Sequence, residues 1–157
     1  MRAGLVGVIR EAAPLHDVGK IAIPDQILLK PGTLTSEERR TMQQHTVLGA
    51  QLLAGSESEI LQMGEKIAIA HHERWDCTGY PDGLTQEEIP LPARIVSVVD
   101  TFDAITRPRP YSSARATEEA KRELVRCSGS QFDPQVVDAF LHLDDRGDHP
   151  PVTSTVV

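Results

Sequence analysis

The chain has 157 residues, a length typical of one compact domain, since domains commonly run to about 100–200 residues. It carries 16 Lys and Arg against 23 Asp and Glu, a formal net charge of -7. That balance argues against a nucleic-acid polymer or an anionic membrane as partner, because both require a basic surface. No apolar run approaches the roughly 20 residues of a membrane span. The two cysteines form neither a disulfide framework nor a zinc pattern, which favours a cytoplasmic protein.

The hydrophobic pattern predicts helices over most of the chain, because apolar residues recur at intervals of three and four. The expected helices cover residues 1–17, 36–54, 57–72, 93–106, 117–129 and 134–143. Gly19 is expected to cap the first helix in the left-handed conformation. Thr35 and Glu38 have the spacing of a capping box at the start of the second. The class is therefore all-α, with one domain over residues 1–143 and a disordered tail at 144–157.

Residues 73–91 interrupt the helical pattern. This segment contains Gly79, Tyr80-Pro81, Asp82-Gly83 and Pro90, too many turn-forming residues for a regular element. Irregular loops of about 15 residues are uncommon in compact domains and often carry function. We therefore expect this loop to belong to a functional site.

Several histidines stand where they could bind metal ions. The pair His16-Asp17 ends the first predicted helix, and His71-His72 ends the third. Each signal alone is weak, because a helix cap or a packed histidine also explains it. Adjacent side chains on a helix diverge by about 100°, so His71 and His72 are expected to serve two neighbouring ions, or one ion and a ligand.

Asp100 is the carboxylate that stands out, because it lies among the apolar residues Val98, Val99 and Phe102. A buried carboxylate needs a partner or a metal ion, unless the helix turns it toward solvent. Taken together, imidazoles and carboxylates from separate helices are the ligand mix of an iron, manganese or zinc site. Such sites are built in the cores of helical bundles.

The combined pattern resembles the HD-GYP domain, a subgroup of the HD phosphohydrolase superfamily, over about residues 10–141. The motifs that carry this resemblance are His16-Asp17-Val18-Gly19-Lys20, His45, His71-His72-Glu73, Gly79-Tyr80-Pro81, Asp100, Arg109-Pro110-Tyr111 and Phe132-Asp133-Pro134. The resemblance implies a helical HD-domain bundle with a long irregular loop around Gly79-Tyr80-Pro81. It also implies two or three divalent transition-metal ions, iron or manganese or else zinc, and hydrolysis of cyclic di-GMP in bacterial second-messenger signalling.

The same resemblance implies roles for individual residues. The implied metal ligands are His16, Asp17, His45, His71, His72 and Asp100. Asp17 and Lys20 would be catalytic, with Lys20 at the scissile phosphate. Tyr80, Asp103 and Arg109 would bind the substrate. We also expect Glu73 either to orient a ligand imidazole or to lie in solvent.

The chain departs from the family pattern at three places. The resemblance implies a helix upstream of His16 that brings another histidine, whereas no histidine precedes His16 here. Cys77 stands where the family has glycine, which costs about 1 kcal/mol if the position requires a positive φ. Ser112 stands where a basic residue is usual. We therefore expect either a truncated domain or an incomplete metal centre.

Two classes of function follow from these observations. The first is a metal-dependent phosphodiesterase that hydrolyses cyclic di-GMP. The alternative is a catalytically degenerate module that binds a protein partner, such as a diguanylate cyclase, receiver or sensor domain. A third reading is hydrolysis of another nucleotide by an HD-type enzyme. Metal content separates the first two, because a competent site is expected to hold at least two ions.

Overall fold

The computed structural model describes residues 3–107 and 115–144. Its elements in chain order are α1 (Ala3–Ala12), the 3-10 helix η1 (Ala13–Ala22), α2 (Asp25–Leu28), α3 (Ser36–Gln43), α4 (His45–Leu53), α5 (Glu59–Ala70), the 3-10 turn η2 (Gln86–Glu88), α6 (Leu91–Thr106), α7 (Arg115–Cys127) and α8 (Pro134–Asp144). The described residues contain isolated β-bridges and no strand, so the all-α prediction is confirmed. Within these ranges no helix has the length and apolar character needed to cross a membrane. Arg109, Ser112 and the tail predicted to be disordered, from residue 145 on, lie outside the described residues.

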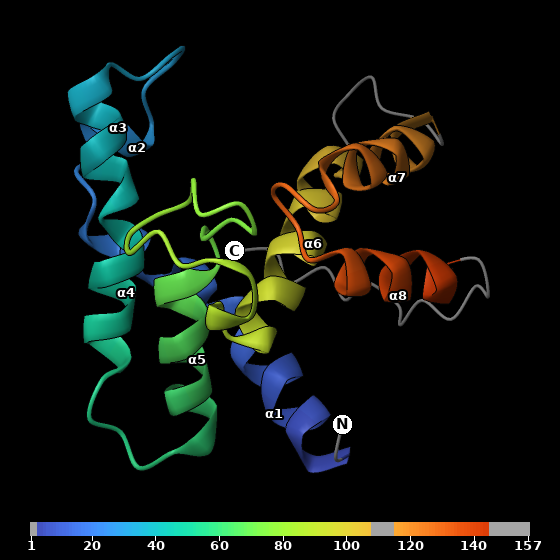
Figure 1. Ribbon diagram of the computed structural model, residues 1–157. Coiled ribbons are helices and arrows are strands. Elements are labelled where there is room, and N and C mark those ends of the chain that lie inside the picture. The colour runs from blue at the N-terminus through green and yellow to red at the C-terminus, as the bar shows by residue number, and fades with distance from the viewer. Residues whose placement is uncertain (1–2, 108–114, 145–157) are drawn as a thin grey trace.

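Figure 1 shows α4 and α5 side by side, with η1 packed against both and α1 against α5. Helix α6 connects this group to α7 and α8, which pack against each other on its other side. The buried residues form separate apolar clusters along this path. One lies between α6, α7 and α8 and contains Val98, Leu124, Cys127, Phe132 and Val137; another, between α1, α5 and α6, contains Ala12, Ile67 and Val96. The metal-binding candidates lie where η1, α4, α5 and α6 meet.

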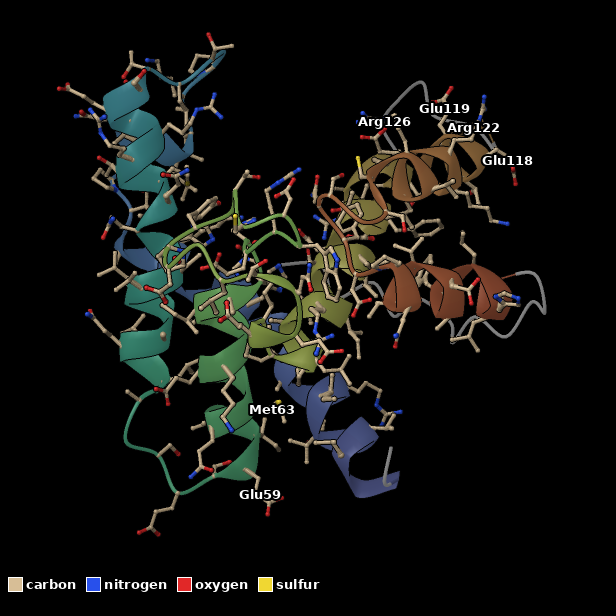
Figure 2. The ribbon with its side chains drawn as sticks, viewed as in Figure 1. Glu59, Met63, Glu118, Glu119, Arg122 and Arg126 are labelled. Atoms are coloured by element: carbon tan, nitrogen blue, oxygen red, sulfur yellow. The ribbon has the colours of Figure 1, made fainter. Side chains whose placement is uncertain are left out.

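Helix α7 illustrates how the sequence pattern places its faces. Its charged side chains Glu118, Glu119, Arg122 and Arg126 are exposed, as Figure 2 shows, whereas Ala120 and Leu124 are buried. This separation follows the period of 3.6 residues expected of a surface helix. The helix begins at Arg115 rather than at Thr117, where a cap was predicted.

The predicted helix over residues 1–17 changes its hydrogen-bonding pattern after Ala12, where α1 ends and η1 begins. Pro14 lies in the first turn of η1, and it has no N–H to continue the α-helical pattern. The prediction that Gly19 is a left-handed cap is wrong, since Gly19 lies within η1. Glycine is needed there for a different reason. A Cβ at this position would overlap the carbonyl oxygen of His45 and the backbone nitrogen of Gly49.

The predicted helix over residues 36–54 is divided into α3 and α4 at Gln44. Side chains at the start of α4 donate hydrogen bonds to the backbone carbonyl oxygens at the end of α3. His45 Nδ1 donates to the carbonyl of Met42 at 2.7 Å, and Thr46 Oγ1 donates to that of Gln43 at 3.0 Å. Such local bonds compete with the helical ladder. The bond to Met42 also fixes the orientation of the His45 imidazole. At the start of α3, the predicted capping box of Thr35 and Glu38 is confirmed.

A buried ion pair joins α6 to the segment before α8. Arg94 Nη1 donates to Asp133 Oδ2 at 2.7 Å, with side chains only 15% and 3% exposed. The second oxygen of Asp133 accepts the backbone N–H of Gln135 at 2.8 Å, in the first turn of α8. Arg94 and the motif residue Asp133 therefore have a structural role, because their ion pair holds α6 and α8 together.

Candidate metal centre

The six residues predicted to be metal ligands come together from four elements. Residues His16 and Asp17 lie on η1, His45 at the start of α4, His71 and His72 directly after α5, and Asp100 on α6. The packing of η1 and α4 through Gly19 and Gly49 brings the first three into range. The sequence prediction of this set is therefore consistent with the arrangement in space.

Four of these residues form a group that can hold a metal ion. Asp17, His45, His71 and His72 each offer one ligand atom, and the four atoms lie within 4.8 Å of one another. The Nε2 atoms of His45 and His71 are 3.5 Å apart, and Asp17 Oδ1 lies 3.5 Å and 3.9 Å from them. Ligands held at about 2.1 Å from one ion are spaced by roughly 3–3.5 Å. The donor set and its spacing therefore fit a metal ion.

The second oxygen of Asp17 faces different partners. Asp17 Oδ2 lies 3.3 Å from His16 Nε2 and 2.5 Å from Lys20 Nζ. His16 Nε2 is also 3.6 Å from Asp100 Oδ1, yet this buried nitrogen has no aligned hydrogen bond to either carboxylate. A buried polar atom of this kind calls for a partner. The nitrogen and its neighbouring carboxylates suit a cation.

Backbone carbonyls set the tautomers of three ligand imidazoles. The Nδ1 atoms of His16, His45 and His71 bond to the carbonyls of Ala13 at 2.8 Å, of Met42 at 2.7 Å and of Ala68 at 3.0 Å, respectively. A carbonyl only accepts, so each Nδ1 carries a hydrogen, and in the neutral rings of His45 and His71 this leaves the lone pair on Nε2. Metal-binding histidines commonly have this second hydrogen bond, which orients the ring.

Burial keeps the innermost imidazoles uncharged. It lowers the pKa of His71 to about 3 and that of His72 to about 4, and it also lowers the pKa of His45. Neutral imidazole is the form that binds a metal ion. At pH 7 no proton has to be removed from these rings before they bind.

The expectation that His71 and His72 serve two neighbouring ions, or one ion and a ligand, is not supported by the local backbone. It assumed a continuous helix, but α5 ends at Ala70 and both histidines lie in the turn that follows. Their ring centroids are 4.0 Å apart, and both belong to the group of four ligands. The turn therefore allows both rings to face one position.

Two cavities flank the cluster, and His72 and Asp100 line both. The first, of about 510 Å³, is also lined by Lys20 and Asp103, as their predicted roles require. Arg107 lines it as well and donates to Asp103 Oδ2 at 2.7 Å. Sequence reasoning missed Arg107, although its spacing of four residues from Asp103 on one helix was a signal.

A family model described as an HD domain matches residues 8–136. The chain belongs to the HD domain family. Its signature motifs are of the HD-GYP type, in agreement with the resemblance stated from the sequence.

Characterised relatives match most of this HD domain. A cyclic di-GMP phosphodiesterase of Thermotoga maritima is 55% identical over 136 residues, which cover 87% of this chain and 37% of the relative. A cyclic di-GMP phosphodiesterase response regulator of Xanthomonas campestris is 53% identical, with 87% and 36% covered. A 3'3'-cGAMP-specific phosphodiesterase of Vibrio cholerae is 42% identical, with 88% and 27% covered. The chain thus spans between about a quarter and little more than a third of the length of these relatives.

A solved structure supports the fold. The crystal structure of a cyclic GMP-AMP-specific phosphodiesterase of Vibrio cholerae aligns with a TM-score of 0.65 and 20% sequence identity. The alignment covers 92% of this chain and 39% of that structure. The helical architecture is therefore that of an HD-domain protein.

The signature loop of this HD domain folds back onto the cluster. The ring of Tyr80 stacks on His72 with centroids 4.9 Å apart and an interplanar angle of 27°. Tyr80 lines the second cavity, and burial raises the pKa of its phenol to about 12, so the hydroxyl remains protonated. A Cβ at Gly79 would collide with the backbone of Glu73 and Arg74, which explains the glycine of this motif.

Glu73 supports the loop, and neither role expected for it is found. Its side chain is buried, which excludes the solvated position. Oε1 accepts the backbone N–H groups of Asp82 at 2.7 Å and Gly83 at 3.1 Å, and Oε2 accepts that of Leu84 at 3.0 Å. Both oxygens are therefore engaged by the loop backbone rather than by an imidazole.

Cys77 has a φ of 60°, in the left-handed region that glycine adopts at least cost. Replacing Cys77 with glycine should therefore raise the free energy of unfolding by about 1 kcal/mol, measured by denaturant unfolding. Cys77→Ala is the matched control, because it removes the thiol but keeps a Cβ, and it should leave stability nearly unchanged. Equal stabilisation by both variants would attribute the effect to the thiol instead of the backbone.

Proposed function

We propose that this HD domain is a metal-dependent phosphodiesterase that hydrolyses cyclic di-GMP in bacterial second-messenger signalling. The observation that carries the proposal is the position of Asp17. Its two oxygens face two sets of metal-type ligands, directly beside a cavity lined by Lys20. The names of the relatives at 55% and 53% identity supply the substrate. A cytoplasmic location is part of the proposal, and the two cysteines are free in the structure.

The cluster divides into two ligand sets that share Asp17. His45, His71 and His72 with Asp17 Oδ1 make one set, and His16 and Asp100 with Asp17 Oδ2 make the other. We assign two or three divalent ions to this centre and favour iron or manganese, while zinc also suits the donors. Divalent ions at such a centre activate water and stabilise charge on phosphoryl oxygens.

Other residues of the chain would bind and orient the substrate. Lys20 pairs with Asp17, and its side chain is 40% exposed and lines the cavity, where the ammonium can meet a phosphate oxygen. Asp103 lines the same cavity and suits the amino group of a guanine. The protonated Tyr80 offers a hydroxyl donor and a ring face from the other side. The substrate-binding role proposed for Arg109 rests on the resemblance alone.

Two other functions remain as alternatives. The relative at 42% identity is named for 3'3'-cGAMP, which supports hydrolysis of another cyclic dinucleotide as the second candidate. The other is a degenerate module that binds a diguanylate cyclase, receiver or sensor domain without turnover. The clustering of the six expected ligands among the described residues favours the enzyme over this module.

The test is metal content and turnover of the purified chain. After anaerobic purification with iron or manganese supplied, we expect at least two ions per chain and hydrolysis of cyclic di-GMP. Protein stripped with a chelator serves as the control and should regain activity when metal is restored. One ion or none, with no hydrolysis, would reject the enzyme in favour of the binding module. Faster hydrolysis of 3'3'-cGAMP than of cyclic di-GMP would instead favour the second candidate.

A further inference from the structure

Two adjacent charged residues hold the signature loop on either side of Gly79-Tyr80-Pro81. Glu73 accepts the backbone N–H groups of residues 82–84, which follow this tripeptide. Arg74 donates to side chains in residues 76–78, which precede it. Glu73 thus supports the loop from one side, and the proposed chemistry assigns Arg74 no role on the other.

The guanidinium of Arg74 bridges two segments that are far apart in the sequence. Its Nε donates to Thr78 Oγ1 at 2.8 Å, and Nε and Nη2 lie 3.3 Å from the two oxygens of Asp76. Its Nη1 donates to Gln131 Oε1 at 3.0 Å, in the connection between α7 and α8. Arginine carries its five donors in a rigid planar fork, so one side chain can reach both segments at once. Lysine has the charge but not this geometry.

Asp76 joins the same two segments. Its backbone N–H donates to the carbonyl of Ser130 at 2.9 Å, and its Oδ1 accepts the N–H of Thr78 at 3.1 Å. Hydrogen bonds from Thr78 and Arg74 lower the pKa of Asp76 to about 2, so its carboxylate is ionised at pH 7. Hydrogen bonds to an ionised group are stronger than neutral ones. Residues 76–78 are therefore held firmly against the connection between α7 and α8.

Tyr80 lies two residues after this anchored segment. Its ring stacks on His72, and its backbone N–H donates to the carbonyl of His72 at 3.3 Å. A ring stack and one long hydrogen bond restrain the loop only weakly along its length. We therefore expect the segments on either side of Tyr80 to fix its position.

We propose that Arg74 is a positioning residue, which holds Tyr80 in place for the substrate by tying residues 76–78 to Gln131. This inference rests on the proposed function, since Tyr80 is assigned there to substrate binding. Arg74 also lines the second cavity, of about 360 Å³, but its donors are engaged by the loop and by Gln131. Helices α7 and α8 contain none of the proposed site residues, yet their connection would in this way contribute to substrate affinity.

The kinetics of Arg74→Ala in the metal-loaded chain test this role. We expect KM for cyclic di-GMP to rise by about 10-fold while kcat and metal content stay the same, because the groups at the cluster are untouched. Arg74→Lys keeps the charge without the fork and should raise KM nearly as much. Arg122→Ala removes an exposed arginine of α7 (Figure 2) and should leave KM unchanged. Recovery of the wild-type KM by lysine would indicate a charge contact with the substrate and overturn the proposal.

A double-mutant cycle decides whether Arg74 acts through Tyr80. In a Tyr80→Ala background, Arg74→Ala should raise KM no further, because the ring that it positions is gone. An equal rise of KM in both backgrounds would overturn the proposal, as would a loss of metal or of kcat. Gln131→Leu removes only the acceptor of Nη1 and serves if Arg74→Ala does not fold. It should raise KM by about 3-fold, and an unchanged KM would contradict the bridge.

Hydrogen exchange of the metal-free chain separates this inference from the proposed function, because it requires no turnover. The amides of residues 78–80 should exchange about 10-fold faster in Arg74→Ala than in the wild type, while those of α4 and α5 stay the same. If the metal-loaded wild type cleaves no cyclic di-GMP, the proposed function fails, and exchange still decides whether Arg74 holds the loop. Unchanged exchange at residues 78–80 would refute the role of Arg74 whatever the activity.

Discussion

Replacing Asp17 with asparagine should remove bound metal and reduce hydrolysis of cyclic di-GMP by more than about a thousandfold. Among the residues that the structure describes, Asp17 is the one whose two oxygens face both ligand sets, at 3.5 Å from His45 Nε2 and 3.3 Å from His16 Nε2. Asparagine keeps one uncharged oxygen and replaces the other with an amino group that cannot bind a metal ion. Metal ions contribute several kcal/mol to such reactions, and each 1.36 kcal/mol is a factor of ten in rate.

Two further variants make the result interpretable. Asp25→Asn removes the same charge from an exposed position of α2 and should change neither metal content nor rate. Lys20→Ala should slow hydrolysis while metal content stays the same, because Lys20 contacts Asp17 and the cavity without being a ligand. Elemental analysis and steady-state rates give both quantities, and circular dichroism confirms the fold. An Asp17→Asn protein with full metal content would refute the shared-ligand assignment.

Replacing Asp133 with alanine should lower the free energy of unfolding by about 3–5 kcal/mol, the cost of leaving a buried charge without its partner. Arg94 is only 15% exposed, and its Nε is already buried without a hydrogen bond. The substitution also removes the acceptor for the backbone N–H of Gln135 at the start of α8. Denaturant unfolding of the metal-free chain measures the change.

Comparison with asparagine separates the two contributions of Asp133. Asp133→Asn keeps an oxygen for the helix start and loses the charge, so it should be less destabilising by about 1 kcal/mol, the worth of a cap. Asp138→Ala, at an exposed position of the same helix, should stay within about 0.5 kcal/mol of the wild type. A loss of under about 1 kcal/mol for Asp133→Ala would show that the ion pair contributes little.

The helices and the ligand set could be predicted because their signals are local or depend on residue type. Periodic apolar residues identify amphipathic helices whatever they pack against, and α8 begins at Pro134 as expected. The histidines and aspartates of the cluster were identified as a combination typical of a known family. The residue types and their spacing along the chain are enough to indicate the family. They do not give the distances between the side chains in space.

The features that escaped prediction depend on contacts between distant segments. The structural roles of Glu73 and Gly79 arise because the loop folds back on itself. The residues next to them in the sequence do not indicate this fold. The orientation of Gln131 depends on Arg74, which is 57 residues away in the chain. Gly19 was predicted as a cap, because glycine after a helix is usually one, and only the position of α4 reveals its packing role.

The contact between Gly19 and Gly49 has a consequence for how this site can vary over evolution. Here η1 and α4 meet backbone against backbone, so no side chain acts as a spacer between them. The separation of Asp17 from His45 is therefore set by main-chain atoms, whose dimensions do not change with sequence. Substitutions elsewhere in the apolar clusters can alter volume and stability while this separation stays constant. The geometry of the centre is therefore less sensitive to substitutions in the core, but position 19 requires glycine, because a Cβ there would overlap backbone atoms of α4.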